Sequence, residues 1–402
     1  MAPSTRYALV AAALAQAATA AGVIEMPITY RNSYAMVSVE AGTPAEEHFL
    51  RFDTGSASTW IVDKKCAQGA CNNYSGFPRV GYNLDGSSTG EQISNSSSIG
   101  YLGGKIAGPG VRDAFRTGDA TWNQTFLNAD ESSWAQLPGD GFLGLAFDTI
   151  SVGATHTVPE TLLSEGALAQ PRFGLYLGTE FNDTNGQPGR GALTFGGSRE
   201  DTYVDGEMTW LPVMKDVAAR EYQLWRAPLL KFSGSHQGAD GQPAGRSRSW
   251  EGQTKSTGVF DTGAGTISVP TWDAYLMYQS IGWDFEAIMT GQHIPLCSEF
   301  NSTWSVTFSF AGPDPDAPAG SPDKYRDIVL TGDQLARPGF AHREDACYPP
   351  FEHGNDDGFF LFGAPLLRLF YTVYDFGGSK PEEYKPQVGF GQLKKEFKPP
   401  GI

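Results

Sequence analysis

Phe52-Asp53-Thr54-Gly55-Ser56 opens a short pattern that this 402-residue chain repeats in its other half as Phe260-Asp261-Thr262-Gly263-Ala264. A single Asp-Thr-Gly triplet usually marks a turn, because Asp and Gly favour turn conformations. In this chain each copy follows an apolar run that is typical of a strand. The repetition is therefore much stronger evidence than one copy would be.

Each copy also has a later apolar partner in its own half, at residues 140–146 and 359–365. The ordered pair of patterns, repeated once, indicates an internal duplication with one carboxylate in each half. Two carboxylates about 3 Å apart cannot both ionise, so such a pair holds one proton over a wide acidic range. The ionised member can accept a proton from water, and the protonated member can donate one to a substrate carbonyl.

Composition restricts the classes of fold and partner. The chain is long enough for two domains, and its 49 Gly and 26 Pro favour many short strands joined by turns over long helices. The net charge of −16 argues against nucleic acid or an anionic membrane as a partner. A low content of basic groups also suits a protein that stays folded in acid, where carboxylates become neutral.

The N-terminus has the features of a secretory signal peptide, which we expect to span residues 1–20. Arg6 precedes a mostly Ala, Leu and Val run over residues 7–17, and Ala18-Thr19-Ala20 has the small-x-small form of a cleavage site. The run is too short and too rich in Ala to span a bilayer comfortably. We therefore predict a secreted, monomeric protein without a membrane partner. Residues 21–33 follow as a short connector or pro-segment remnant, or alternatively as the first strand of the mature protein.

Cysteines and glycosylation sequons fit an oxidising compartment. Cys66 and Cys71 are close enough for a small loop, whereas Cys297 and Cys347 would close a larger one, and the sequence alone does not choose among the three pairings. No histidine lies at ligand spacing from them, so no metal site is expected. Five Asn-x-Ser/Thr sequons are consistent with glycosylation: Asn73, Asn95, Asn123, Asn182 and Asn301.

Local patterns give an outline of the elements. Alternation of apolar and polar residues predicts a strand at 34–40, and helical spacing predicts helices at 158–168 and 271–281. The polar stretches 81–98 and 234–255 are predicted to be loops.

The chain resembles the pepsin-like aspartic peptidases, and in particular the secreted, fungal-type members with a short pro-segment. This resemblance implies an all-β, bilobal fold: two pseudo-symmetric β lobes with a central cleft and a few short helices. The lobes would span residues 34–200 and 201–402. The matching stretches are the two triplets, residues 34–44, Trp60, Cys66 and Cys71, and residues 193–197, 371–375 and 388–390.

Carried over residue by residue, the resemblance makes Asp53 and Asp261 the catalytic dyad. Thr54 and Thr262 would bond across to the other lobe and hold the carboxylates coplanar. The loops that support the dyad would be formed by Thr54, Gly55, Ser56, Thr262, Gly263 and Ala264. Glycine allows backbone and substrate to approach closely at two of these positions.

Tyr101 matches the tyrosine of the hairpin, called the flap, that covers the cleft in this family. Residues 101–108 have the length and the closing glycine of that hairpin, with Gly103 near its turn. Leu102 stands where the family has a glycine, which makes this match weaker. Trp60 is expected to support the Tyr101 hydroxyl, so that the closed flap excludes water.

Two departures from the family pattern lie beside the dyad. Ala264 stands where a hydroxyl residue is usual, while Ser56 keeps its hydroxyl. Because a hydroxyl that bonds a carboxylate favours the ionised form, Asp53 is expected to be the ionised member of the pair. Arg51 lies where the family has an apolar or small polar residue, which suggests an altered preference that tolerates acidic side chains. Alternatively, Arg51 points to solvent or pairs with a surface acid.

The sequence thus predicts an aspartic endopeptidase that hydrolyses peptide bonds at acidic pH through a water activated by the dyad. No cofactor is expected, and the substrate would be an extended polypeptide bound as an added strand. The alternative is a catalytically weak or inactive pepsin-like protein that serves as a binding protein or inhibitor, because a fold does not guarantee activity. Both carboxylates, both threonines and the candidate flap tyrosine favour the enzyme.

Overall fold

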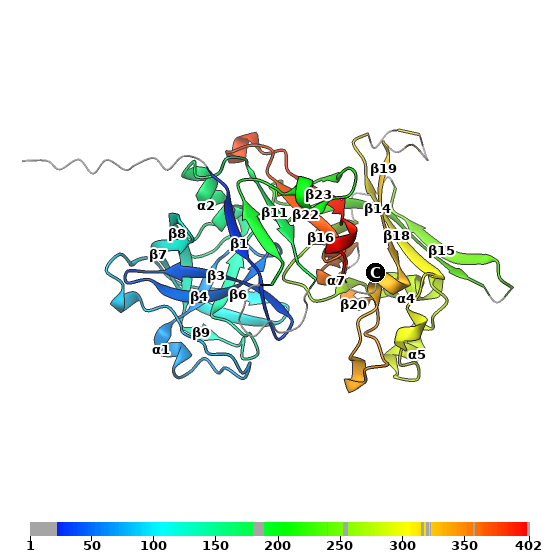
Figure 1. The fold of residues 1–402 in the computed structure, drawn as a ribbon, viewed down its shortest axis with the longest axis horizontal. Helices are drawn as coiled ribbons and strands as arrows, with labels where there is room; N and C mark the ends of the chain where they lie inside the picture. Colours follow the sequence, from blue (N-terminus) through cyan, green and yellow to red (C-terminus); the bar gives the residue numbers. More distant parts are fainter. Residues whose placement is uncertain are drawn as a thin grey trace, which may run out of the picture.

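The computed structural model describes residues 22–179, 189–238, 240–251, 256–314, 317–318, 321, 323–356 and 358–399. Strands dominate this part of the chain and helices are short, the longest being the ten-residue α4 (Thr271–Ser280). Figure 1 shows the strands of the first half, in blue and cyan, on one side and those of the second half on the other. The predicted all-β, bilobal fold is confirmed.

The first lobe is built on a nine-stranded sheet that carries the first triplet. The strand order is β2-β3-β4-β10-β5-β8-β7-β6, with β9 paired to β7. The strands are β2 (Thr29–Arg31), β3 (Tyr34–Ala41), β4 (Glu46–Asp53), β5 (Trp60–Val62), β6 (Glu91–Tyr101), β7 (Gly104–Thr117), β8 (Ala120–Ala129), β9 (Glu131–Ser132) and β10 (Gly141–Gly144).

The second lobe is built on an eight-stranded sheet that carries the second triplet. Its order is β19-β18-β14-β16-β21-β17-β20, with β15 paired to β14. The strands are β14 (Arg226–Gln237), β15 (Pro243–Ser249), β16 (Thr257–Phe260), β17 (Ile267–Pro270), β18 (Trp304–Ala311), β19 (Tyr325–Thr331), β20 (Glu352–Asn355) and β21 (Phe359–Phe362).

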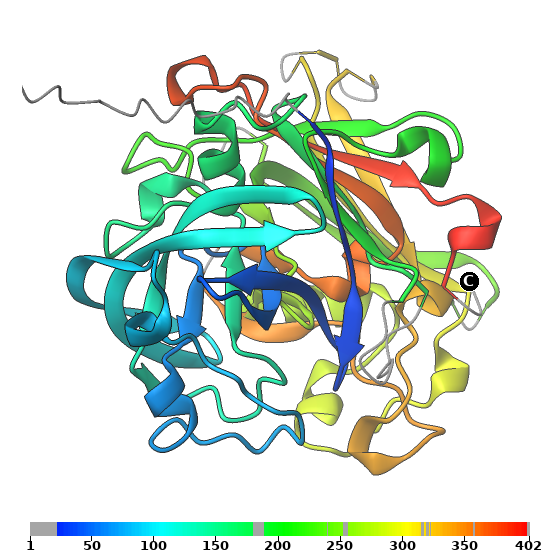
Figure 2. The same ribbon diagram turned by 60° about the vertical axis from the view of Figure 1, so that its left-hand side comes forward.

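A six-stranded sheet joins the two halves. Its order is β1-β12-β11-β22-β23-β13, from β1 (Ile24–Pro27), β12 (Ala192–Phe195), β11 (Arg172–Tyr176), β22 (Phe370–Asp375), β23 (Gln387–Gln392) and β13 (Thr209–Pro212). At the junction between β11 and β22, Phe173 pairs with Tyr374 and their rings stack 4.8 Å apart. In Figure 2, β1 lies beside strands of this sheet that are far from it in sequence.

Short helices close the connections between the sheets. The predicted helix at 158–168 is α2, which begins at Val158 as expected but ends at Ser164, and Gly166 follows with a φ of +67°. The predicted helix at 271–281 is α4. The remaining helices are α1 (Lys64–Ala67), α3 (Glu200–Tyr203), α5 (Phe285–Met289), α6 (Gly332–Leu335), α7 (Ala364–Leu367) and the 3₁₀ turns η1 (Leu84–Gly86), η2 (Asp148–Ile150), η3 (Cys297–Glu299), η4 (Phe340–His342), η5 (Pro381–Glu383) and η6 (Lys395–Phe397).

Three expectations about polar or connecting segments are wrong. The stretch 81–98, predicted as a loop, contains most of β6, and 234–255 contains the end of β14 and all of β15. The strands β6 and β15 expose most of their side chains, so they need no apolar alternation and their sequences look like loops. The segment 21–33, expected as a connector, contributes β1 to the central sheet and β2 to the first lobe, while its assignment to a pro-segment remnant or to the mature protein stays a prediction.

Within the described residues, no helix is long and apolar enough to cross a membrane.

Candidate active site

Each aspartate stands at the end of a strand beside the second signature of its own half. Asp53 ends β4, and the parallel strand β10 places Gly144 opposite it. Asp261 directly follows β16, and the parallel strand β21 places Phe362 opposite Phe260. The repeated pair of motifs is thus a repeated pair of parallel strands, one pair in each lobe.

The glycines of these second signatures allow the loops to pack closely. A Cβ atom at Gly144 would lie 2.1 Å from the Ala57 carbonyl oxygen, and one at Gly363 would lie 2.3 Å from that of Ala264. Neither position can hold a larger residue without moving the backbone that carries an aspartate. The apolar-apolar-Gly pattern therefore has a steric cause that is the same in both lobes.

Thr54 and Thr262 join the lobes by four hydrogen bonds beneath the carboxylates. The Thr54 amide donates to the Thr262 hydroxyl at 3.0 Å, and the Thr262 amide donates to the Thr54 hydroxyl at 2.9 Å. Each hydroxyl donates in turn to a carbonyl across the interface, Thr54 to Phe260 at 2.7 Å and Thr262 to Phe52 at 3.1 Å. Both threonines are buried, so these bonds hold the two aspartate loops in a fixed relative position.

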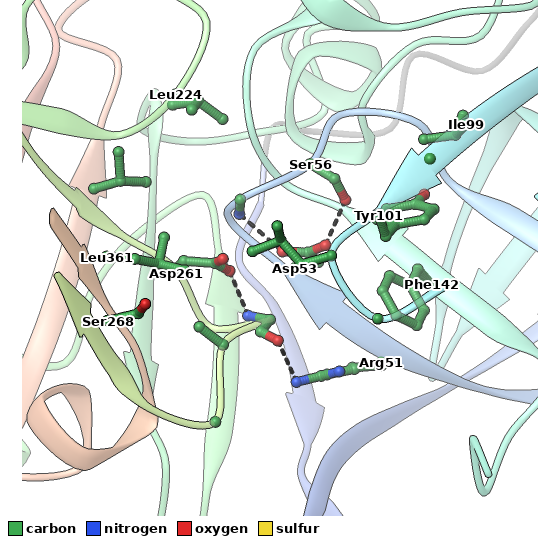
Figure 3. Close-up of a pocket in the computed structure, with 18 of the residues that line it drawn as sticks. Arg51, Asp53, Ser56, Ile99, Tyr101, Phe142, Leu224, Asp261, Ser268 and Leu361 are labelled. Atoms are coloured by element: carbon green, nitrogen blue, oxygen red, sulfur yellow. Dashed lines mark hydrogen bonds between the residues drawn. The ribbon is translucent and has the colours of Figure 1, made fainter. Parts of the chain in front are cut away.

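The carboxyl groups of Asp53 and Asp261 point toward each other across the lobe boundary (Figure 3). A Cβ atom at Gly55 would lie 2.4 Å from Cγ of Asp261, and one at Gly263 would lie 2.4 Å from Oδ1 of Asp53. Each carboxylate also accepts an amide N–H from the glycine of its own triplet, at 2.8 Å for Gly55 and 2.6 Å for Gly263. Glycine at these positions is what lets the two carboxyl groups meet.

The two carboxyl groups have different surroundings. Ser56 Oγ donates to Asp53 Oδ2 at 2.6 Å, whereas Ala264 has no hydroxyl to offer Asp261. Removal from solvent raises the pKa of Asp261 well above its usual range, and the neighbouring Asp53 adds to this through its charge and a hydrogen bond. The Arg51 charge and the Gly263 amide oppose the shift of this pKa. This arrangement favours a shared proton that stays on Asp261 while Asp53 is ionised.

Tyr101 ends β6 next to the turn of the β6–β7 hairpin, and its ring lies on the Asp53 side of the carboxyl pair (Figure 3). Its ring lies 5.2 Å from that of Phe142 and 5.7 Å from that of Trp134, and Trp60 stacks on Phe142 at 5.1 Å. Burial, followed by the Asp53 charge, raises the pKa of the Tyr101 hydroxyl. Among the described residues, neither this hydroxyl nor the Trp60 indole N–H has a hydrogen-bond partner, so the expected support of Tyr101 by Trp60 is not a hydrogen bond; both rings pack on Phe142 instead.

Trp134 is a site residue that the sequence did not reveal. Its ring lies under the hairpin turn, where a Cβ atom at Gly103 would come within 2.8 Å of it. It is half-buried and stands between β9 and β10, outside every motif. Because Trp134 is an isolated tryptophan after a short polar segment, no local sequence pattern predicts that it packs under the flap.

Arg51 reaches across the lobe boundary from the wall of the cleft. Its Nη2 donates to the carbonyl oxygen of Gly263, and its guanidinium carbon lies 4.8 Å from the Tyr34 ring centre and 5.5 Å from that of Phe142. No carboxylate of the described residues forms an ion pair with it. The alternative expectation, a surface position or a surface ion pair, is therefore wrong.

Asp53, Asp261, Tyr101, Trp134 and Arg51 line one cleft of about 930 Å³ between the lobes, whereas Thr54, Thr262 and Trp60 are not among its lining residues. Its walls include the flap residues 98–103 and Trp134 from the first lobe, and residues 263–266 and Glu352 from the second. The lining is more apolar than polar, with the carboxyl pair at the lobe boundary. Such a cleft can hold a polypeptide segment with its backbone close to both carboxyl groups.

The structure pairs Cys66 with Cys71 and Cys297 with Cys347. Among the sequons, Asn95 and Asn123 are exposed on strands β6 and β8, and Asn73 and Asn301 are half-buried in turns. Asn182 and the expected signal peptide lie outside the described residues.

Two β-rich lobes with a facing pair of Asp-Thr-Gly loops are the architecture of bilobal aspartic proteases. The family model described as eukaryotic aspartyl protease matches residues 33–382, and the chain belongs to this family. It is similar to the vacuolar aspartic protease of Candida albicans, with 30% identity over 88% of this chain and 76% of that protein. It is also similar to gastricsin of Mus musculus, with 26% identity over 89% of this chain and 82% of that protein. Human gastricsin is 26% identical over 88% of this chain and 82% of its own length.

Proposed function

We propose that this protein is an aspartic endopeptidase that acts at acidic pH, with Asp53 and Asp261 as its catalytic residues. The observation that carries the proposal is the meeting of two equivalent carboxyl groups, one from each lobe, above reciprocal threonine bonds. Membership of the aspartyl protease family supports the reaction class.

In the proposed reaction, a water molecule lies between the two carboxyl groups. Asp53, ionised and held by Ser56, accepts a proton from this water as its oxygen attacks the peptide carbonyl carbon. Asp261 donates its proton to the carbonyl oxygen, which gives a neutral tetrahedral diol. The nitrogen then takes the proton from Asp53, a diol hydroxyl returns one to Asp261, and the C–N bond breaks. No acyl-enzyme forms, and no cofactor takes part.

The substrate would be an extended polypeptide lying along the cleft beneath the flap. Tyr101 would close over it and keep bulk water from the carboxyl pair. We further propose that the protein is a secreted monomer, glycosylated on exposed sequons such as Asn95 and Asn123. The acidic net charge is consistent with a partner that is neither nucleic acid nor an anionic membrane surface.

A test of the catalytic proposal uses denatured globin between about pH 3 and pH 5, with and without a statine-type transition-state analogue. Asp53→Asn and Asp261→Asn variants are matched controls, because the amide keeps the shape and removes the ionisation. We expect inhibitable cleavage by the natural chain and a loss of at least about a thousandfold in either variant. Absence of inhibitable cleavage at every acidic pH would favour the alternative, a binding or inhibitor protein.

The residue at position 264 favours the alternative function, a binding or inhibitor protein, and the experiment above therefore tests for it. Ala264 leaves Asp261 without the hydroxyl that Ser56 gives Asp53, so the two halves of the pair are unequal. A protein that binds the analogue tightly, yet cleaves nothing, would fit a binding role.

A further inference from the structure

Arg51 is the one cation among the described residues that line the cleft. The other charged lining residues are the two catalytic carboxyls and Glu352. Since Arg51 and Asp53 are two positions apart on strand β4, their side chains project from the same face, about 7 Å apart along the strand. A group bound to Arg51 would therefore lie directly beside the reacting peptide bond.

The guanidinium is held in place by neutral groups. The rings of Tyr34 and Phe142 flank it, and one of its five N–H bonds is directed to the carbonyl oxygen of Gly263. None of its nitrogen atoms is both buried and without a partner, so the remaining donors reach the solvent of the cleft. Among other half-buried arginines, Arg172 is paired with Asp375 and Arg226 with Asp216, whereas Arg79 and Arg337 donate to backbone carbonyls. Arg51 is thus a cation that is held in place and still has N–H groups available to bind a ligand.

We propose that Arg51 is a specificity-determining residue that binds a substrate carboxylate next to the scissile bond. This inference rests on the proposed endopeptidase function and names its substrate class, peptides with Glu or Asp at that position. A guanidinium matches a carboxylate with two parallel N–H bonds, and flanking rings preserve its orientation. A free chain terminus offers the same carboxylate chemistry, so the test separates the two sources.

Acidic conditions give the inference a distinctive signature. Free Glu and Asp side chains ionise near pH 4, whereas the guanidinium stays charged throughout. A free substrate Glu is therefore ionised at pH 5 and largely neutral at pH 3, and because Arg51 favours the ionised form, the free energy needed to remove the proton reduces the preference at pH 3. The other titratable groups facing this position are Asp53, Asp261, Tyr34, Tyr101 and Glu352. Comparing a Glu peptide with its Gln counterpart at the same pH cancels the effect of these groups on the catalytic step.

The experiment compares blocked peptides that carry either Glu or Gln on each side of the scissile bond. For the natural chain we expect kcat/KM to favour Glu over Gln about tenfold at pH 5, with the ratio falling toward one at pH 3. Arg51→Gln should bring the ratio near one at both pH values, and Arg51→Lys should keep part of the preference. Binding of the statine-type analogue to each variant reports whether its cleft has folded.

The outcomes separate this inference from the proposed function. Cleavage of the Gln peptides without a Glu preference, or a Glu preference unchanged in Arg51→Gln, overturns the role of Arg51 alone. The natural chain could instead prefer peptides with a free C-terminus over amidated ones, and lose this preference in Arg51→Gln. That result would support a carboxylate site at Arg51, but one that binds chain termini. If no peptide is cleaved, the proposed function fails, and the same peptides are compared as ligands by calorimetry. Equal affinity for Glu and Gln peptides then overturns the inference.

Discussion

Ser56 and Ala264 occupy matching positions after the two triplets, and only Ser56 carries a hydroxyl. Introducing Ala264→Thr places a donor near Asp261, which stabilises its ionised form and lowers its raised pKa. Loss of the proton from Asp261 ends activity on the alkaline side, so we expect that limb of the kcat/KM profile to move down by about 0.5 to 1 pH unit. Ala264→Val is the matched control, because it has the shape of Thr without the hydroxyl. Equal shifts in both variants would contradict the explanation.

Much of the candidate site could be predicted from the identity of its residues. The triplets are recognisable because their chemistry requires Asp, Thr and Gly in that order, and the structure gives each a steric or hydrogen-bonding reason. The contact of Arg51 with Gly263 could not be predicted in the same way, because these residues lie in different halves of the chain. Local sequence shows that Arg51 is unusual, but only the three-dimensional structure shows its partner.

At the scale of single elements, the flap depends on one ring beneath its turn. Trp134 packs against Gly103 and Gly104, and it also contacts Tyr101. We expect Trp134→Ala to loosen the hairpin, with faster amide exchange over residues 96–109 and a several-fold rise in KM, because the closed flap loses its support. The stability loss should be about 2 to 3 kcal/mol, below that of a fully buried aromatic residue.

Two variants distinguish a specific effect on the flap from general destabilisation. Trp134→Phe keeps an aromatic ring and should retain most of the protection of residues 96–109. Tyr74→Ala removes a ring that is 67% exposed in the same lobe, and should change neither exchange nor KM. Faster exchange in Tyr74→Ala, or none in Trp134→Ala, would show that Trp134 does not support the flap.

Elements with one buried face were predictable, and exposed hairpins were not. Helices α2 and α4 are each followed by a glycine with a positive φ, and α2 also begins at a Thr157 cap followed by Pro159, signals that sequence patterns record. The strands β6 and β15 carry Ser, Gly and Arg on largely exposed surfaces, so neither periodicity nor hydrophobicity marks them as strands. Their partner strands supply the hydrogen bonds, and that pairing is not encoded locally.

At the scale of the whole molecule, the sequence predicts the duplication but not how the two halves are joined. Repeated motifs predict two similar lobes, yet the central sheet pairs β1 with β12 and β11 with β22 across long separations in sequence. Such pairings depend on the packing of complete lobes. The boundary between the lobes also holds the buried carboxyl group of Glu160, from the first half, near Tyr384 from the second.

Glu160 of α2 is buried at this boundary, near Asp148 and Tyr384. Burial, followed by the charge of Asp148, raises its pKa to about 8. A carboxyl group whose pKa is higher in the folded than in the unfolded chain stabilises the fold fully below its unfolded value, near pH 4.5. That contribution disappears as pH rises through the folded value, so the protein should lose on the order of 4 kcal/mol between about pH 4.5 and pH 8.

Glu160→Gln isolates this contribution, because the amide stays neutral and can still accept the Asp148 amide N–H that Glu160 Oε2 accepts at 3.0 Å. We expect the variant to be more stable than the natural chain at pH 8, by several degrees in Tm, and similar to it at pH 4. Glu207→Gln, at an exposed position, is the control and should leave the pH dependence unchanged. The natural chain would then be most stable in the acidic range where the Asp53–Asp261 pair holds a single proton. Parallel stability curves for Glu160→Gln and the natural chain would mean that another group sets the alkaline limit.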